Sequence, residues 1–169
     1  GLAEAAYLQA TRVKPEDLET HRVLIHLLLK QGKKEQAVNA AENGLEALPG
    51  NMSLLITLAQ IQSRLDRSED AIATYRRALR QDRGSDVAAN DLALLLLSRG
   101  GQGDLEEALS LVEHFRSTKI PHFQDTLGWV YLSLKQPSEA LYLLEKAAEG
   151  LPENLEVRYH LGMAYLANG

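Results

Sequence analysis

The same residue types recur along this chain at a fixed spacing of 34 positions. The segment LGWVY at 127–131 returns as LGMAY at 161–165. The same spacing separates Ala3, Ala37 and Ala71, and also Leu24, Leu58 and Leu92. A constant period of this length indicates a repeat architecture, in which each unit stacks on its neighbours to bury a shared strip of core. This period constrains the fold more than the overall composition does.

The segment 121–154 shows what one unit contains. Leu127, Gly128 and Tyr131 fall on one face of a first predicted helix, and Ala140, Leu144 and Ala147 fall on one face of a second. The small side chains of Gly128 and Ala140 would let two antiparallel helices approach closely. Pro137 separates the helices, because proline stops one helix and is tolerated in the first turn of the next. We therefore predict a pair of packed helices.

The pattern L-G-x-x-Y, then A-x-x-x-(aromatic or Leu)-x-x-A, then Pro, resembles the tetratricopeptide repeat, and 34 residues is the length of that repeat. Leucine-rich and armadillo repeats have other lengths, and the T-P-L-H of ankyrin repeats is absent. The resemblance implies an all-α, right-handed superhelix of antiparallel helix pairs, an α-solenoid.

We divide the chain into four full repeats with a half repeat at each end. The predicted boundaries are 1–17, 18–51, 52–85, 86–120, 121–154 and 155–169. Repeat 86–120 is irregular, with a Gly-rich turn predicted over 100–104 and its alanine, Ala108, three residues late. We interpret this turn as a tolerated surface insertion, with an adapted binding loop as the alternative.

The two half repeats are complementary, so we expect the chain to belong to a longer array. A second expectation is head-to-tail self-association, in which helix 155–168 of one molecule packs against helix 1–12 of the next. Such a contact is heterologous and does not close.

Composition and motifs exclude several function classes. A net charge of −5 and a pI near 5.5 argue against nucleic-acid binding. No run of 18 apolar residues is present, so we expect no membrane insertion. The chain contains no cysteine, no H-E-x-x-H, no G-x-S-x-G and no P-loop. We predict no enzymatic activity, no cofactor and no metal site.

The predicted function is that of a protein–protein interaction scaffold or adaptor. The resemblance implies that a partner protein or peptide binds in the concave groove lined by the first helix of each repeat. The predicted groove residues are Arg22, His26, Gln60, Arg64, Asn90, Asp91, Asp125, Trp129, Tyr159 and Met163. A peptide with an acidic part followed by apolar residues would suit this set, and a merely solvated inner face is the alternative. The positions do not match the Lys, Asn and Arg clamp that holds a C-terminal carboxylate in chaperone-binding relatives.

Trp129, the only tryptophan, has two interpretations. Packing between adjacent first helices is the one we favour, and a binding anchor is the other. The segments ANDLALLLL, DTLGWVY and LPENLEVRYHLGMAYL also resemble bacterial tetratricopeptide proteins of exopolysaccharide and protein-sorting systems of the envelope. Two further functions stay open: a non-catalytic arm of a larger enzyme or export machine, and a self-assembly module.

Overall fold

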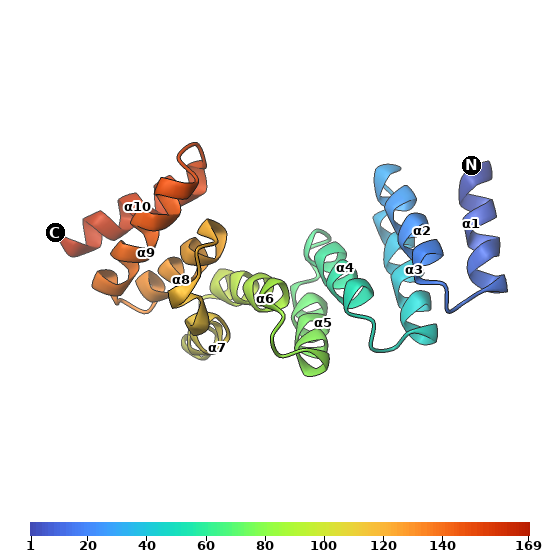
Figure 1. The fold of residues 1–169 in the computed structure, drawn as a ribbon, viewed down its shortest axis with the longest axis horizontal. Coiled ribbons are helices and arrows are strands. Elements are labelled where there is room, and N and C mark those ends of the chain that lie inside the picture. Colours follow the sequence, from blue (N-terminus) through green and yellow to red (C-terminus); the bar gives the residue numbers. More distant parts are fainter. The chain divides into compact units, whose positions relative to one another are not determined.

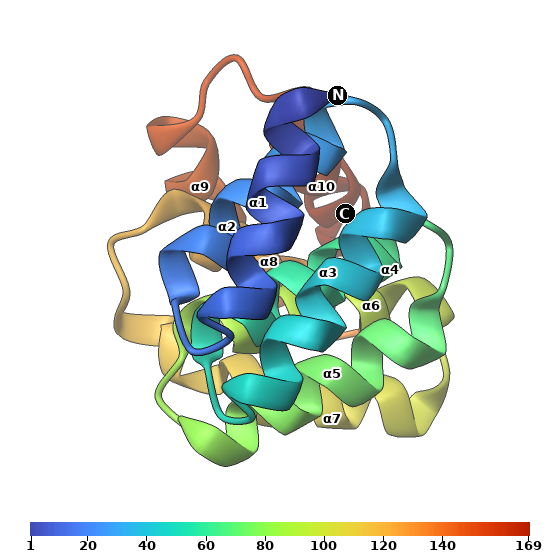
Figure 2. The ribbon, with the colours of Figure 1, turned by 90° about the vertical axis from the view of Figure 1, so that its right-hand side faces the viewer.

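The structure, a computed structural model, describes all of residues 1–169. It contains ten α-helices, one 3-10 helix and no strand (Figure 1). The chain forms two compact units, residues 1–85 and 86–169. Within each unit every helix packs against the next one along the chain (Figure 2). This all-α arrangement confirms the predicted α-solenoid of helix pairs.

The first unit contains α1 (Leu2–Val13), α2 (Leu18–Lys30), α3 (Lys34–Ala47), α4 (Met52–Ser63) and α5 (Ser68–Gln81). The second contains α6 (Asp86–Arg99), α7 (Gln102–Val112), the 3-10 helix η1 (Glu113–Ser117), α8 (Pro121–Ser133), α9 (Pro137–Gly150) and α10 (Leu155–Asn168). The predicted division into repeats with the boundaries given above stays a prediction.

Close packing of the helix pairs depends on small residues, and Gly128 is the clearest case. A Cβ atom at Gly128 of α8 would lie 2.7 Å from Cγ of Leu144 and 3.4 Å from the carbonyl oxygen of Ala140, both on α9. Gly128, Leu144 and Ala140 are all buried. The absent side chain therefore provides the space that Leu144 fills.

The turns between paired helices share one backbone conformation. Gly32, Asp66, Gly100 and Lys135 all have positive φ angles, of 73°, 59°, 68° and 60°. In the turn after α2, the backbone N–H of Gly32 donates to Leu29 and that of Lys33 donates to Leu28. This pairing satisfies carbonyl groups that the end of α2 leaves open. A left-handed residue thus ends the first helix of each pair.

Exchanging glycine and lysine between two of these turns should change stability in opposite directions. Lys135→Gly should raise the free energy of unfolding by about 0.5–1 kcal/mol, because glycine adopts a positive φ without the steric cost of a Cβ. Gly32→Lys should lower it by about 1 kcal/mol for the same reason. Urea denaturation followed by circular dichroism measures both changes. A stability loss in Lys135→Gly would contradict the argument.

The predicted turn over 100–104 is shorter in the structure, which is a correction. Only Gly100 and Gly101 lie outside helices, because α7 begins at Gln102. Leu105 therefore occupies the position held by Ala37, Ala71 and Ala140, five residues after the left-handed turn residue in each pair. Ala108 is not a displaced repeat alanine, and the proposed binding loop at this turn loses its basis.

The irregularity lies instead after α7, in the 3-10 helix η1. The left-handed residues Gly32, Asp66 and Gly100 are spaced by 34, whereas Gly100 and Lys135 are 35 apart. The extra residue is accommodated by η1, which turns Phe115 into the core, where it is 1% exposed. Its ring stacks on Phe123 with centroids 4.4 Å apart. The insertion therefore adds core contacts and no exposed loop.

Candidate partner-binding faces

On each of α2, α6, α8 and α10, residues spaced three and four apart form a stripe along one face. In α8 this stripe contains His122, Asp125 and Trp129, and in α10 it contains Glu156, Tyr159, His160 and Met163. Nine of the ten predicted groove residues lie on the first helices α2, α4, α6, α8 and α10, and the tenth, Arg64, directly follows α4. These ten side chains differ from one another in how much of each is exposed.

In the first unit, α2 and α4 together line a surface hollow. Its walls include Arg22, His26 and Leu29 of α2, with Thr57 of α4 at its edge. Arg22 and His26 are exposed. One guanidinium nitrogen of Arg22 lies 3.1 Å from a carboxylate oxygen of Glu19, a surface pair that contributes little stability. The hollow thus carries Arg22 and His26 beside the carboxylate of Glu19 and aliphatic side chains such as Leu29.

The other two predicted residues of the first unit lie on α4 and at its end. Gln60 is half-buried within α4, whereas Arg64 follows the last residue of the helix and is exposed. The carbonyl oxygen of Arg64 accepts a hydrogen bond from Nζ of Lys34 at 3.3 Å. The guanidinium group of Arg64 is therefore a further exposed cation of this unit.

In the second unit, Asn90 and Asp91 of α6 are half-buried and contact each other. The amide nitrogen of Asn90 donates to a carboxylate oxygen of Asp91 at 3.3 Å. The side-chain oxygen of Asn90 is buried without a hydrogen-bond partner. Val87 and Leu94, on the same stripe, are 47% and 40% exposed. The α6 stripe is therefore more apolar than the two predicted residues alone indicate.

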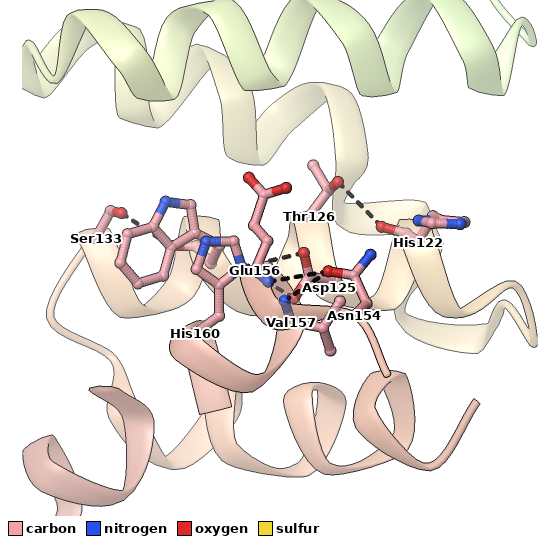
Figure 3. Close-up of polar contacts among 9 residues, drawn as sticks. His122, Asp125, Thr126, Ser133, Asn154, Glu156, Val157 and His160 are labelled. Carbon is pink, nitrogen blue, oxygen red and sulfur yellow. Dashed lines mark hydrogen bonds and ion pairs between the residues drawn. The ribbon is translucent and has the colours of Figure 1, made fainter. Parts of the chain in front are cut away.

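Asp125, predicted as a groove residue, is only 8% exposed and is bound inside the protein. Nδ1 of His160 lies 3.0 and 3.1 Å from its two carboxylate oxygens (Figure 3). Because a carboxylate only accepts hydrogen bonds, Nδ1 carries the proton and donates it. His160 is itself 5% exposed. Asp125 therefore links α8 to α10 instead of standing free in a groove.

Trp129 takes part in the same contact between helices. Its indole stacks on the ring of His160, with centroids 4.1 Å apart and planes 16° apart. Tyr159 approaches at 6.0 Å with a tilt of 55°. Trp129 is half-buried, whereas Tyr159 is 58% and Met163 37% exposed. The favoured interpretation of Trp129, packing between adjacent first helices, matches this geometry.

Sequence reasoning did not find the Asp125–His160 pair. The repeat spacing contains a signal for this pair. The two residues are 35 positions apart, one more than the repeat length, so they lie one position apart when successive first helices are aligned. Side chains at neighbouring register positions of packed parallel helices can meet. Only the structure shows that they do, at hydrogen-bonding distance.

A second polar cluster lies away from these stripes, where η1 meets α8. The hydroxyl of Tyr131 donates to the carboxylate of Glu113, whose oxygens lie 2.8 and 2.7 Å away, and Arg116 also contacts that hydroxyl. The guanidinium carbon of Arg116 lies 5.2 Å from the centre of the Tyr131 ring. Burial, followed by the bond to Glu113, raises the pKa of Tyr131 to about 12.

This raised pKa predicts a stability loss at alkaline pH. The folded state holds the Tyr131 proton more tightly than the unfolded state, whose pKa is about 10. The contribution is therefore complete below pH 10 and is lost as the pH rises to about 12, by up to about 3 kcal/mol. Denaturation curves of Tyr131→Phe measured beside the parent isolate this change from other alkaline effects. Equal losses in both proteins would contradict the prediction.

The structure brings together no group of three or more His, Cys, Asp or Glu side chains that could hold a metal ion. None of its helices combines the length and the apolar character needed to cross a membrane. The exposed apolar faces of α1 and α10, where head-to-tail self-association is predicted, carry Tyr7 and Tyr165 at 37% and 51% exposure. That self-association stays a prediction.

Comparisons with known proteins agree with this fold. Residues 28–95 match a tetratricopeptide repeat family model. Over 163 residues the chain is 29% identical to human interferon-induced protein with tetratricopeptide repeats 2. The alignment covers 92% of this chain and 34% of that protein. The chain therefore spans about a third of the length of this relative.

Two solved structures are similar in fold at low sequence identity. A tetratricopeptide repeat protein from Parabacteroides merdae matches with a TM-score of 0.79 and 16% identity, over 99% of this chain and 66% of that one. YrrB, described as having an unusual peptide-binding site, matches with a TM-score of 0.77 and 16% identity, over 96% and 84%. The repeat period, the packed helix pairs, the family model over residues 28–95 and the similar solved structures together support a tetratricopeptide repeat protein.

Proposed function

We propose that this chain is an adaptor segment that binds a peptide stretch of a protein partner along the stripes of its first helices. The observation that carries the proposal is the set of exposed side chains that repeat at matching register on these helices. In the first unit they line the hollow at α2 and α4, with Arg22 and His26 exposed. In the second, the exposed ring of Tyr159 lies beside the half-buried ring of Trp129.

Each unit presents to the partner a face with its own chemistry. Arg22, His26 and Arg64 favour acidic residues where the segment meets the first unit. Leu94, Tyr159 and Met163, which are between 37% and 58% exposed, favour side chains with an apolar part where the partner meets the second unit. Exposed apolar side chains gathered on one face are typical of interaction surfaces. The peptide-binding site named for YrrB makes peptide recognition a reasonable function for this fold.

Non-catalytic scaffolding is the general role of tetratricopeptide repeat proteins, and the proposal needs no catalytic residue. A role as an arm of a larger enzyme, a place in envelope export or polysaccharide assembly, and a bacterial origin stay predictions.

A cross-linking capture experiment tests the proposal. The parent is compared with a variant in which Arg22, Asn90 and Trp129 are changed to alanine. A control variant changes Asn39, Arg80 and Tyr142, which are exposed on the second helices α3, α5 and α9. The two triple variants remove matching side-chain types from different faces. Circular dichroism and thermal denaturation establish that both keep the helical fold.

A partner retained by the parent and the control, and lost by the first variant, is the expected result. We expect the loss to exceed about tenfold, because a few central aromatic and arginine side chains carry most of the energy at protein interfaces. Capture that both variants reduce equally, or that neither reduces, would place binding away from the first-helix stripes and contradict the proposal.

A further inference from the structure

The exposed surface between α8 and α10 combines two aromatic rings with a carboxylate. Tyr159 stands beside Trp129 with ring centroids 6.0 Å apart and a tilt of 55°, so the two rings meet at an angle. Glu156 lies three residues before Tyr159 and is exposed on the same face of α10. Figure 3 shows the Glu156 side chain extending to the same side of α10 as the His160 ring.

The rings are held in place by buried contacts. His160 covers one face of the Trp129 indole at 4.1 Å, and its own orientation is set by the bond from Nδ1 to Asp125 at 3.0 Å. The main-chain N–H groups of Glu156 and Val157 donate to the side chain of Asn154, which fixes the first turn of α10. A ligand would therefore meet a Trp129 ring that is already ordered, and this ring loses little conformational entropy on binding.

The charge of the second unit selects the class of ligand. Residues 86–169 contain 12 Asp and Glu against 6 Lys and Arg, a net charge of −6 without histidines. Aromatic faces attract cations through the ring quadrupole, and arginine is the cation found most often over tryptophan and tyrosine. An apolar side chain would gain only from burial, whereas a guanidinium group gains from the rings and from Glu156.

We propose that Trp129, Tyr159 and Glu156 form a recognition site for a cationic side chain, an arginine or lysine, within the partner segment. The inference rests on the proposed function and adds a basic residue to the part of the segment that meets α8 and α10. Trp129 and Tyr159 contact the cation through their rings, and Glu156 contacts it through its carboxylate. Met163, one turn beyond Tyr159 and 37% exposed, contacts the aliphatic part of the same side chain.

Three labelled peptides of one design test the inference. They alternate leucine with arginine, with serine or with glutamate, and fluorescence anisotropy measures their affinities at physiological ionic strength. Because Trp129 is the only tryptophan, its intrinsic fluorescence reports whether a peptide reaches this site. We expect the arginine peptide to bind at least about tenfold more tightly than the serine peptide and to change the Trp129 emission.

Matched variants locate the binding. Tyr159→Ala and Glu156→Gln should each weaken the arginine peptide about threefold to tenfold. Tyr142→Ala and Glu139→Gln are the controls, since both residues are exposed on α9, away from this face, and they should leave the affinity unchanged. Replacing arginine by citrulline in the peptide, which removes the charge and keeps the shape, should weaken binding by a similar factor.

Each other outcome overturns the inference. The first two below, which concern the serine and glutamate peptides, leave the proposed function standing. Equal affinity for the serine peptide, lost in Tyr159→Ala, would show that the site takes an apolar anchor. Tightest binding of the glutamate peptide would show the opposite charge preference. Binding of the arginine peptide with no change in Trp129 emission, or unaffected by Tyr159→Ala, would place the cation elsewhere. Binding of no peptide would also overturn it, and the capture experiment would then decide the proposed function independently.

Discussion

Replacing Gly128 by alanine lowers the free energy of unfolding by about 1–3 kcal/mol, although alanine is the better helix former. The added Cβ would lie 2.7 Å from Cγ and 2.9 Å from Cδ2 of Leu144, closer than side-chain carbons approach in folded proteins. Leu144 is fully buried, so it cannot move aside without disturbing the core between α8 and α9. Overpacking of this kind costs more than the gain in helix propensity.

The matched control is Gly162→Ala, at the same position of the repeat, 34 residues later. Nothing lies within 4 Å of a Cβ built at Gly162. Alanine there should raise the free energy of unfolding by about 0.5–1 kcal/mol through helix propensity alone. The same substitution at equivalent positions is therefore expected to have opposite signs.

Urea denaturation monitored by Trp129 fluorescence measures both variants, because the single tryptophan reports on the second unit. In a repeat protein the units can unfold separately, so this local probe is preferable to a global one. The Leu144→Ala background should reduce the cost of Gly128→Ala, since the clashing atoms are gone. An unchanged cost in that background would rule out Leu144 as the cause.

Replacing His160 by leucine should lower stability by about 2–4 kcal/mol. The carboxylate of Asp125 would lose its hydrogen-bond donor while it stays buried, and removal of one member of a buried pair costs more than the pair itself contributes. The stacking partner of Trp129 would also be lost. The same urea denaturation, followed by circular dichroism and by Trp129 fluorescence, measures the change.

The double variant Asp125→Leu/His160→Leu separates charge burial from packing. If the isolated carboxylate causes most of the loss, the double variant is more stable than His160→Leu alone, because no buried polar group is left unsatisfied. A double variant as unstable as the sum of the two single variants would assign the loss to packing. Tyr142→Leu, an exposed position of α9, should change stability by less than about 0.5 kcal/mol.

The repeat period predicts most of the fold because each helix is specified by residues close together in the sequence. The spacing of apolar residues specifies helices, and the small residues Gly128 and Ala140 specify where two helices meet. The left-handed turn after α2 falls on Gly32, with a φ of 73°, and glycine is the residue that adopts this conformation most readily. Asp66 and Lys135 adopt the same conformation without being glycine, so residue type alone identifies only part of these turns.

The irregular repeat shows where alignment by residue type fails. The sequence pattern predicts Ala108 as the displaced repeat alanine, but Leu105 occupies that position because α7 begins at Gln102. Leucine can replace alanine there when its neighbours leave room, and a sequence pattern contains no measure of that room. The spacing of 35 between Leu92 and Leu127 predicts one extra residue in this repeat, but only the backbone places it in η1.

The sequence by itself determined the helix pairs, the repeat family and the helices that carry the candidate contacts, because helical periodicity depends only on the order of residues. The tertiary structure alone decided which of those contacts are available. Asp125 is buried on His160, Trp129 packs against the same ring, and Tyr159 is left exposed. These differences arise from the distance between α8 and α10, which begin 34 residues apart in sequence. That distance depends on how side-chain volumes fit together.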